Sequence, residues 1–299
     1  MVITEVDALL MKRRTFLKNL TAGALVSGGL GQWLEVLADE NIFLVPQQKQ
    51  FELFGPGMDE HIKDGINKVK DFDRSYTDDV LLRPEMMGLL KSTVGRFSRL
   101  QRLVGYANFN LLGFDEAIKY ASRYSKVGAF TKQELDFIES IFFEDATRYG
   151  FLGNKVITDL TTQISSRETI KLPRTGHYLF KGQPLDMYNK IKKDVGRNVI
   201  LTSGIRGVVK QIHLFLAKAI KTKGNLSQAS RSLAPPGHSY HGIGDFDVGK
   251  IGFGASNFTE AFSKTREYKK LKELGYVMIR YTEDNPYGVR FEPWHIKVV

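Results

Sequence analysis

Apolar side chains recur every three or four positions from about residue 47 to residue 164, a spacing typical of amphipathic helices. The clearest of these helices is predicted to follow Thr131, where Thr-Lys-Gln-Glu forms a capping box and leads into an apolar face that starts at Leu135. No group of residues in this stretch has the spacing of a catalytic set. We therefore predict that residues 39–168 form a helical accessory region that shapes a cleft or docks a partner.

The pattern changes near Thr169 to short apolar runs separated by glycines and aromatic residues. Periodicity predicts two helices, over residues 186–195 and 206–221, and three strands, over residues 198–202, 276–281 and 288–298. No strand–helix–strand repeat with a glycine-rich phosphate loop is present in the sequence. We therefore predict the α+β class, with an antiparallel sheet and flanking helices in a C-terminal domain over residues 169–299.

The composition limits the chemistry that this domain can perform. The 299 residues include no cysteine, which excludes disulfides, a thiol nucleophile and cysteine-ligated zinc or iron–sulfur sites. Any metal must therefore be bound by histidine or carboxylate side chains. The 43 Lys and Arg exceed the 33 Asp and Glu by ten and are spread along the chain, which favours anionic surroundings without naming them.

The N-terminal segment has the order of an export signal. A basic stretch that contains Arg13 and Arg14 precedes a weakly apolar, glycine-containing stretch and a small-residue end at Ala38. Residues 1–38 resemble a twin-arginine signal peptide, and the alternative is an amphipathic N-terminal helix. The resemblance implies the twin-arginine translocation machinery as a partner and a periplasmic or otherwise exported protein. It also implies that the chain meets the membrane only during export, unless the segment is retained as an anchor.

Histidines and carboxylates gather near the C-terminus, where four of the six histidines follow residue 210. His241 lies in a loop of turn residues with Asp245 and Asp247, and Glu292 precedes His295 by three positions. A hydrolytic zinc site commonly uses two imidazoles and a carboxylate and leaves a fourth position for water. His241, Asp247 and His295 would supply that set of ligands.

Hydrolysis also needs a base beside the water and positive charge near the developing oxyanion. Glu292 can act as the base if the Pro-Trp segment after it turns back toward the site. Arg206 follows the predicted strand that ends in Thr-Ser-Gly and can supply the positive charge.

These residues resemble the zinc D-alanyl-D-alanine carboxypeptidases and dipeptidases, the VanY-type or LAS metallopeptidases, a group that also includes the hedgehog signalling domain. Their signature is Ser-x-His-x-x-Gly-x-Ala-x-Asp followed by Glu-x-x-His, with a Ser-Gly-Tyr-Arg segment upstream and a Gln five residues later. The matching positions here are Ser239, His241, Gly244, Glu292, Trp294, His295, Ser203, Gly204, Arg206 and Gln211.

The resemblance implies a role for each matched side chain. Zinc would be bound by His241, Asp247 and His295, with Glu292 as the general base and Arg206 polarising the substrate carbonyl. Ser239, Gln211 and Trp294 would contact the substrate or support the residues that do.

One spacing departs from the family pattern. The family places its His and Asp ligands seven residues apart, whereas His241 and Asp247 are six apart and the Ala position is lost. We prefer Asp247, with a one-residue deletion in the loop, and keep Asp245 as the alternative carboxylate ligand.

The resemblance implies a zinc peptidase that removes a terminal D-alanine from peptidoglycan stem peptides. Two alternatives stay open, a peptidoglycan endopeptidase of the same family and a non-catalytic cell-wall-binding protein that retains the zinc fold. The positive charge alone would allow nucleic-acid binding, but no nucleic-acid motif is present and the export signal argues against that role.

Overall fold

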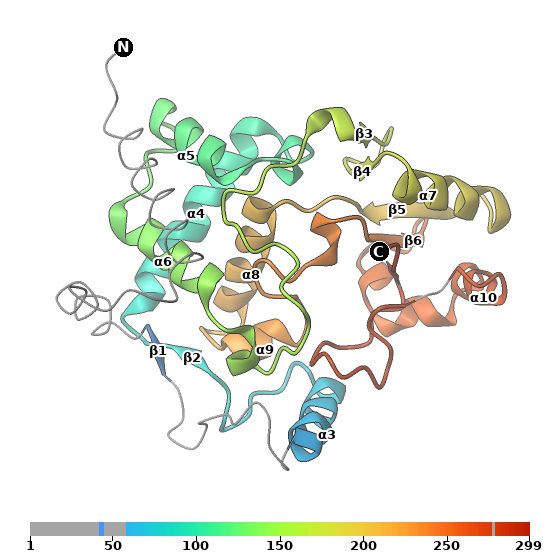
Figure 1. Cartoon of the computed structure of the whole chain (residues 1–299), viewed down its shortest axis with the longest axis horizontal. Coiled ribbons are helices and arrows are strands. Elements are labelled where there is room, and N and C mark those ends of the chain that lie inside the picture. Colours follow the sequence, from blue (N-terminus) through green and yellow to red (C-terminus); the bar gives the residue numbers. More distant parts are fainter. Residues whose placement is uncertain (1–41, 45–57, 277–278) are drawn as a thin grey trace, which may run out of the picture. The chain divides into compact units, whose positions relative to one another are not determined.

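The computed structural model describes residues 42–44, 58–276 and 279–299 (Figure 1). The chain divides into two units, Met1–Phe43 and Leu44–Val299, and all the described residues except Ile42 and Phe43 belong to the second unit. The predicted export signal, residues 1–38, lies outside the described residues. Among the helices that the structure describes, none has the length and apolar character needed to cross a membrane.

Helices dominate the N-terminal half of the described chain, as the periodicity predicts. Its helices and strands are β1 (Phe43–Leu44), α3 (Met58–Lys70), β2 (Leu81–Leu82), α4 (Met86–Val104), α5 (Phe114–Arg123) and α6 (Lys132–Phe143), with 3-10 turns at Asn108–Asn110, Ala146–Tyr149 and Ser166–Glu168.

The capping box before α6 is confirmed. The Thr131 hydroxyl accepts a hydrogen bond from the Glu134 amide, and the Glu134 carboxylate accepts one from the Thr131 amide. Glu134 is buried and also pairs with Arg96 of α4 at 2.7 Å. One side chain therefore both starts α6 and attaches it to α4.

Strands and helices alternate in the C-terminal half. The elements are β3 (Thr169–Lys171), β4 (Tyr178–Phe180), α7 (Gln183–Asp194), β5 (Val199–Ser203), α8 (Val208–Lys221), α9 (Leu226–Ser230), β6 (Phe246–Lys250), α10 (Arg266–Glu273) and β7 (His295–Ile296), with 3-10 turns at Tyr240–Gly242, Gly254–Phe258 and Glu260–Lys264. Strands β5, β6 and β7 form an antiparallel sheet in that order, and β3 pairs with β4. The α+β class with an antiparallel sheet is therefore confirmed.

The two strands predicted nearest the C-terminus are much shorter than expected. Residues 288–298 contribute only His295–Ile296, and the described part of 276–281 pairs only through Ile279 and Ile296. The side-chain Nδ2 of Asn285 donates hydrogen bonds to the backbone carbonyls of Thr282 and Val289. Side-chain hydrogen bonds therefore fix this turn, and they replace the regular strand pairing that the apolar alternation predicts.

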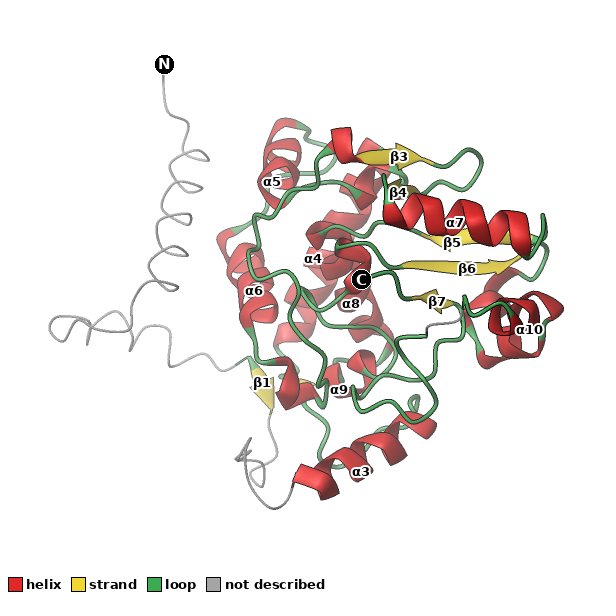
Figure 2. Ribbon diagram, turned by 45° about the vertical axis from the view of Figure 1, so that its right-hand side comes forward, coloured by secondary structure: helices red, strands yellow, loops and turns green. Residues whose placement is uncertain are grey.

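The β5–β6–β7 sheet has one apolar face, along which α7 lies (Figure 2). Alternate residues of a strand point to opposite faces, so Phe246 and Val248 enter the core while Asp247 between them points the other way. The core on the apolar face is built largely from Leu179, Tyr188, Ile191, Val199, Leu201, Phe246, Val248, Phe262, Leu271, Trp294 and Ile296. Packing on one face thus fixes which residues face the opposite side.

Helix α8 packs against α4, α5 and α9 near the middle of the unit (Figure 1). It is strongly amphipathic, and its buried side chains include Val209, Ile212, Phe215 and Leu216. The contact between α4 and α8 crosses the predicted boundary at residue 168. The division into residues 39–168 and 169–299 stays a prediction.

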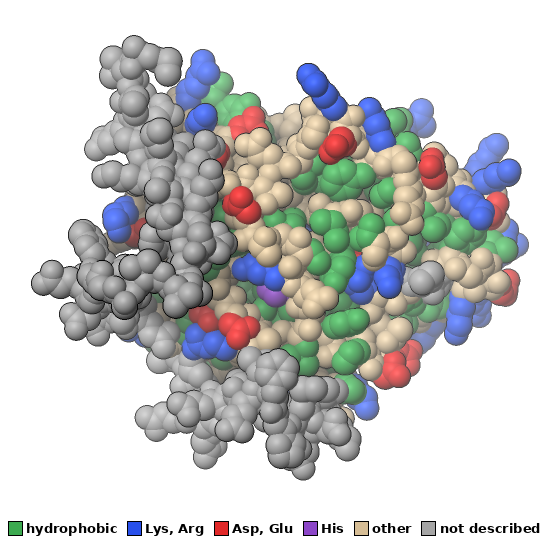
Figure 3. Space-filling model, viewed as in Figure 1, with side chains coloured by type: hydrophobic (Ala, Val, Ile, Leu, Met, Phe, Trp, Pro, Cys, Tyr) green, Lys and Arg blue, Asp and Glu red, His purple; other side chains and the backbone are tan. Residues whose placement is uncertain are grey.

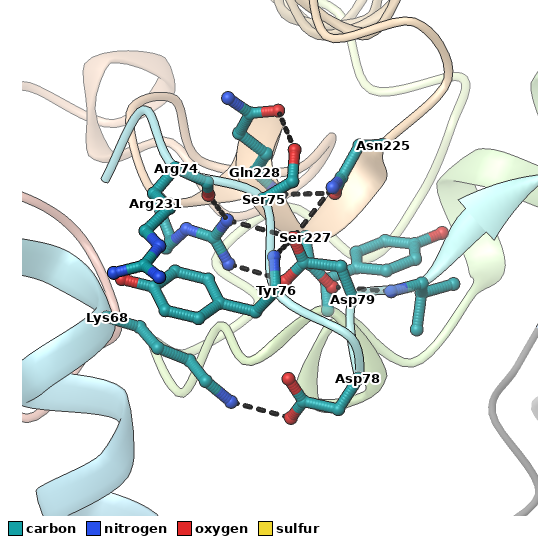
Figure 4. A network of polar contacts seen from close by, with 12 residues as sticks. Lys68, Arg74, Ser75, Tyr76, Asp78, Asp79, Asn225, Ser227, Gln228 and Arg231 are labelled. Atoms are coloured by element: carbon teal, nitrogen blue, oxygen red, sulfur yellow. Dashed lines mark hydrogen bonds and ion pairs between the residues drawn. The ribbon is translucent and has the colours of Figure 1, made fainter. Parts of the chain in front are cut away.

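A buried polar network joins the segment after α3 to α9 (Figure 4). The Arg231 guanidinium makes two hydrogen bonds to Asp79, at 2.7 and 3.1 Å, and Asn225 donates to the same carboxylate at 2.7 Å. Arg231 also donates to the carbonyls of Phe72 and Arg74. Both charges are buried, and their partners satisfy the hydrogen-bonding groups that burial removes from water.

The surface has a mixed charge pattern. Figure 3 shows Lys and Arg side chains spread over the described part of one face, among neutral and hydrophobic ones. This agrees with the even spread of basic residues along the sequence.

Candidate metal centre

The sheet register places three polar residues side by side at one end of the strands. Asp247 of β6 is directly opposite Ser203 of β5 on one side and His295 of β7 on the other. Residues opposite each other in an antiparallel pair have Cβ atoms about 4.5–5.5 Å apart. The register shifts between Leu201 and Ser203, a bulge that turns the end of β5 at this position. Backbone pairing therefore brings residues 203, 247 and 295 together.

His241 reaches the same place from the 3-10 turn Tyr240–Gly242. Its Nδ1 donates to the Gly204 carbonyl at 2.9 Å, and the His241 carbonyl accepts from the Arg206 amide. This arrangement leaves Nε2 unprotonated and 3.2 Å from Oδ1 of Asp247. The six-residue spacing between His241 and Asp247 thus still lets the two side chains meet.

His295 lies between two carboxylates. Its Nε2 donates to Oδ2 of Asp245 at 2.9 Å, and its Nδ1 lies 3.4 Å from Oδ1 of Asp247. Asp245 also accepts hydrogen bonds from Arg280 and from the Val298 amide. Burial opposes ionisation of Asp245, but His295 and Arg280 outweigh it and hold the pKa of this carboxyl well below its usual range. The alternative ligand Asp245 is therefore placed to orient His295.

His241, Asp247 and His295 form a set that could hold a metal ion, because their ligand atoms all lie within 4.8 Å of one another. Oδ1 of Asp247 is buried between the two imidazoles and accepts no hydrogen bond. Burial raises the pKa of Asp247, but the two histidines outweigh it and keep the carboxyl ionised. Burial and Arg206 lower the pKa of His241, which favours the neutral imidazole that binds metals. Burial also opposes protonation of His295, but Asp245 and Asp247 outweigh it and raise its pKa to about 9, so a metal bound at Nδ1 would displace a proton. Two imidazoles with fixed outer partners and an ionised carboxylate fit a zinc ion.

Glu292 lies next to this set without belonging to it. Its Oε2 is 3.7 Å from Nδ1 of His295. Burial raises the pKa of Glu292 to about 7, although His295 acts in the opposite direction. A carboxyl with a pKa near neutrality can both take up and release a proton at that pH.

Arg206 is held at the rim of the set by three side chains. Its guanidinium lies 3.5 Å from Oδ2 of Asp247, donates to the Ser203 hydroxyl at 3.2 Å and donates to Oε1 of Gln211 at 3.4 Å. Gln211 in turn donates to the Ala234 carbonyl and is buried. Gln211 therefore holds the Arg206 guanidinium in place, which is one of the two roles that the resemblance implies for it.

These residues open into a cleft of about 670 Å³. The predicted site residues that line it are Ser239, Trp294, Arg206, Glu292, His241, Asp247 and His295, while Gln211 is not among the lining residues. His238 is not among the lining residues, because its Nδ1 donates to the Gly153 carbonyl at 3.0 Å and its ring packs on Phe151. The structure thus gathers every predicted site residue except Gln211 around one cavity.

His177 and Tyr281 are among the residues that line the cleft but were not singled out by the sequence analysis. His177 follows the turn between β3 and β4, and burial lowers its pKa to about 4 despite the nearby Asp247. The Tyr281 ring lies 5.1 Å from the His295 ring, and the Tyr281 carbonyl accepts from the Glu292 amide. Neither residue belongs to a spaced motif, so only the tertiary fold reveals its position.

The part of the chain that builds this centre can be compared with known families. Residues 182–299 match the VanY family, D-alanyl-D-alanine carboxypeptidase. The VanY match contains every predicted site residue and covers less than half of the chain. Helices α3 to α6 and the β3–β4 hairpin with His177 lie outside it. No curated protein matches the chain.

Two solved structures also show similarity to this chain. The LdcB LD-carboxypeptidase, whose structure reveals the molecular basis of peptidoglycan recognition, is 24% identical over 44% of this chain, with a TM-score of 0.37. This chain spans 63% of that protein's length. A mutant vancomycin-resistance D,D-pentapeptidase VanY in complex with Zn(II) is 23% identical over 44% of this chain and 78% of its own, with a TM-score of 0.36. Both TM-scores lie below 0.5, so neither shows a common fold.

Proposed function

We propose that this protein is a zinc-dependent peptidase that removes the terminal D-alanine from peptidoglycan stem peptides. The observation that carries the proposal is the convergence of His241, Asp247 and His295 beside the separate carboxylate of Glu292, within the residues that match VanY. A ligand set with a base next to it, in an open cleft, is what metal-assisted hydrolysis needs.

Zinc would be held by Nε2 of His241, Nδ1 of His295 and a carboxylate oxygen of Asp247. When bound there, zinc supplies Lewis acidity that polarises a carbonyl and acidifies a water. Asp245 and the Gly204 carbonyl fix the rotation of the two imidazoles through their other nitrogens.

Glu292 accepts a proton from the attacking water and delivers it to the amine that leaves when the peptide C–N bond breaks. Its burial and its pKa of about 7 suit both transfers near neutral pH. Arg206 places a fixed positive charge near the carbonyl oxygen, where negative charge develops in the transition state. Ser203 and Gln211 hold Arg206 in place, and Ser239 and Trp294 line the cleft on which the peptide lies.

The test combines metal content with turnover on the full chain. Elemental analysis is expected to find one zinc per chain, and a pentapeptide stem that ends in D-Ala-D-Ala is expected to release D-alanine. Glu292→Gln should keep the zinc and lower the rate by about 10²–10⁴-fold, the usual contribution of a general base. Glu283→Gln removes an exposed carboxylate elsewhere and serves as the matched control.

Other results of this test point elsewhere. Absence of zinc, or turnover that is independent of Glu292, overturns the proposal. Zinc without release from the pentapeptide shifts attention to cross-linked peptides, whose cleavage would identify an endopeptidase. Peptidoglycan binding without any cleavage would identify the non-catalytic role.

We also propose that residues 1–38 direct export through the twin-arginine pathway, on the basis of the paired Arg13 and Arg14 and the apolar stretch after them. Replacing both arginines with lysine should keep the protein in the cytoplasmic fraction. Export of that variant would contradict the proposal.

A further inference from the structure

One face of α8 extends the cleft away from the metal centre. The cleft is lined by four residues of this helix, Lys210, Leu214, Lys218 and Lys221. Their spacing of three and four positions places them on one side of the helix. Lys210 and Lys221 are eleven positions apart, about 16 Å along the helix axis at 1.5 Å per residue. We call Lys210, Lys218 and Lys221 the lysine row.

The charges along the cleft are sharply divided. The carboxylates among the described lining residues are Asp247 and Glu292, both at the metal centre. The cationic residues there are the lysine row, Arg206 and Arg290. Outside the lining, Asp73 lies 3.7 Å from Lys218 but is mostly exposed, so water screens this pair. The arm of the cleft along α8 is therefore positively charged.

Like charges held together in a cleft focus a field that attracts anions. Burial lowers the pKa of Lys210 to about 8, and nearby Arg206 acts in the same direction. Burial lowers the pKa of Lys218 as well, with Arg290 and Lys221 adding to the effect and Asp73 opposing it. An anionic ligand would raise the pKa of Lys210 and of Lys218 and so stabilise their protonated ammonium groups.

We propose that the lysine row is a subsite for carboxylate groups on the acyl side of the scissile bond, so that the preferred substrate is an acidic peptide lying along α8. This inference rests on the proposed function. A leaving group of one residue needs little room, so the long arm must hold the acyl part of the peptide. At about 3.3 Å per residue, 16 Å accommodates about five extended residues.

The test compares two peptides that end in D-Ala-D-Ala and differ only in two upstream side chains, Glu in one and Gln in the other. The full chain loaded with zinc should cleave the acidic peptide with a KM about tenfold lower, since two partly exposed ion pairs are lost in its neutral partner. Raising the salt concentration should reduce the difference, because salt screens exposed charges.

The variant Lys218→Gln/Lys221→Gln leaves Lys210 in place and should remove most of the difference between the two KM values. Lys190→Gln/Lys193→Gln removes the same charge from the exposed surface of α7, outside the cleft, and should preserve the preference for the acidic peptide. Equal KM values for the unaltered protein, or equal loss of preference in both double variants, would overturn the inference while leaving the proposed function intact.

Binding of the two peptides to Glu292→Gln, measured by calorimetry, gives the same comparison without turnover. Tighter binding of the acidic peptide that depends on Lys218 and Lys221 supports the subsite even if hydrolysis fails. Equal binding of both peptides overturns it. Failure of the proposed function is recognised separately, by the absence of zinc and of D-alanine release.

Discussion

Asp245 and Asp247 show how two carboxylates two positions apart take on different tasks. Asp247 points its Oδ1 at both imidazoles, whereas Asp245 bonds the outer nitrogen of His295 together with Arg280 and a backbone amide. Because Asp245 already has these partners, its ionised form is stabilised without a metal. Asp247 has an oxygen that no hydrogen bond satisfies.

The two positions should respond differently to the loss of charge. Asp247→Asn removes a ligand, so we expect no zinc to survive dialysis against a weak chelator. Asp245→Asn leaves the three ligands in place and should weaken zinc binding by about 10–100-fold, the usual effect of losing an outer-shell partner. Competition with a chromophoric chelator measures both effects. The reverse order of effects would make Asp245 the ligand.

His213 is buried on α8 between the rings of Phe97 and Phe109. Its Nε2 lies 3.1 Å from the Ser98 hydroxyl, while its Nδ1 is buried without a hydrogen-bond partner. Burial lowers its pKa to about 4, and Lys210 adds to the effect. A proton added at Nδ1 would therefore have no acceptor.

This burial predicts how stability depends on pH. The pKa of His213 in the folded state lies below the unfolded value of about 6.5, so its contribution is fully present above pH 6.5 and is lost as pH falls toward 4. Urea unfolding at several pH values should show that His213→Gln weakens this slope. Because His177 also has a pKa of about 4, a residual slope is expected in the variant. An unchanged slope would contradict the prediction.

At the scale of elements, the site depends on how closely β5 and its following turn approach β4. A Cβ added at Gly204 would lie 2.0 Å from the Tyr178 carbonyl, which accepts a hydrogen bond from the Ile205 amide. The Gly204 carbonyl in turn holds His241. The absence of a side chain at this position therefore lets the strand end orient a ligand.

Gly204→Ala should accordingly damage both stability and metal binding. We expect the free energy of unfolding to fall by about 1–3 kcal/mol, as for overpacked sites, and zinc affinity to fall because His241 is displaced. Gly88→Ala in α4 is the matched control, since nothing lies within 4 Å of the added Cβ and Ala favours helix. Urea unfolding and chelator competition measure the two effects. Wild-type zinc affinity in Gly204→Ala would contradict this reasoning.

The elements also show what a sequence can and cannot predict. The capping box at Thr131 and the amphipathic α8 depend on neighbours within a few positions, so local pattern suffices. The C-terminal strands were predicted too long, because the apolar alternation does not reveal the hydrogen bonds of the Asn285 side chain.

Some residues of the candidate site could be predicted from the sequence and others could not. His241, Asp247 and His295 lie in recognisable motifs, and the fold brings their side chains together although the His241–Asp247 spacing is one residue shorter than the family's. His177 and Tyr281 reach the cleft through tertiary packing, and no spacing in the sequence indicates it. The role of Gln211 behind Arg206 likewise depends on which way α8 faces, which a motif does not specify.

At the scale of the whole unit, the Asp79–Arg231 pair connects residues more than 150 positions apart. The Arg231 carbonyl also accepts from the Arg290 amide, two residues before Glu292. The network therefore links the segment after α3 to the chain that carries the proposed base.

Breaking this pair should cost far more than breaking a surface pair. Asp79→Asn leaves a buried guanidinium without its counter-charge, so we expect the free energy of unfolding to fall by about 3–5 kcal/mol. Lys132→Gln breaks an exposed ion pair with Asp136 and should change the free energy of unfolding by less than about 1 kcal/mol. Urea denaturation of both variants makes the comparison. Equal effects would show that the buried pair contributes no more than a surface contact.

The cross-strand register of Ser203, Asp247 and His295 has a consequence for changes in chain length. A residue inserted within β6 before Asp247 would shift the pairing by one and exchange the core and cleft faces of the strand. A residue gained or lost in the turn between His241 and β6 leaves that pairing intact. The chain can therefore vary in length on the approach to the sheet, while inside the sheet its length is fixed by the metal ligands and the core together.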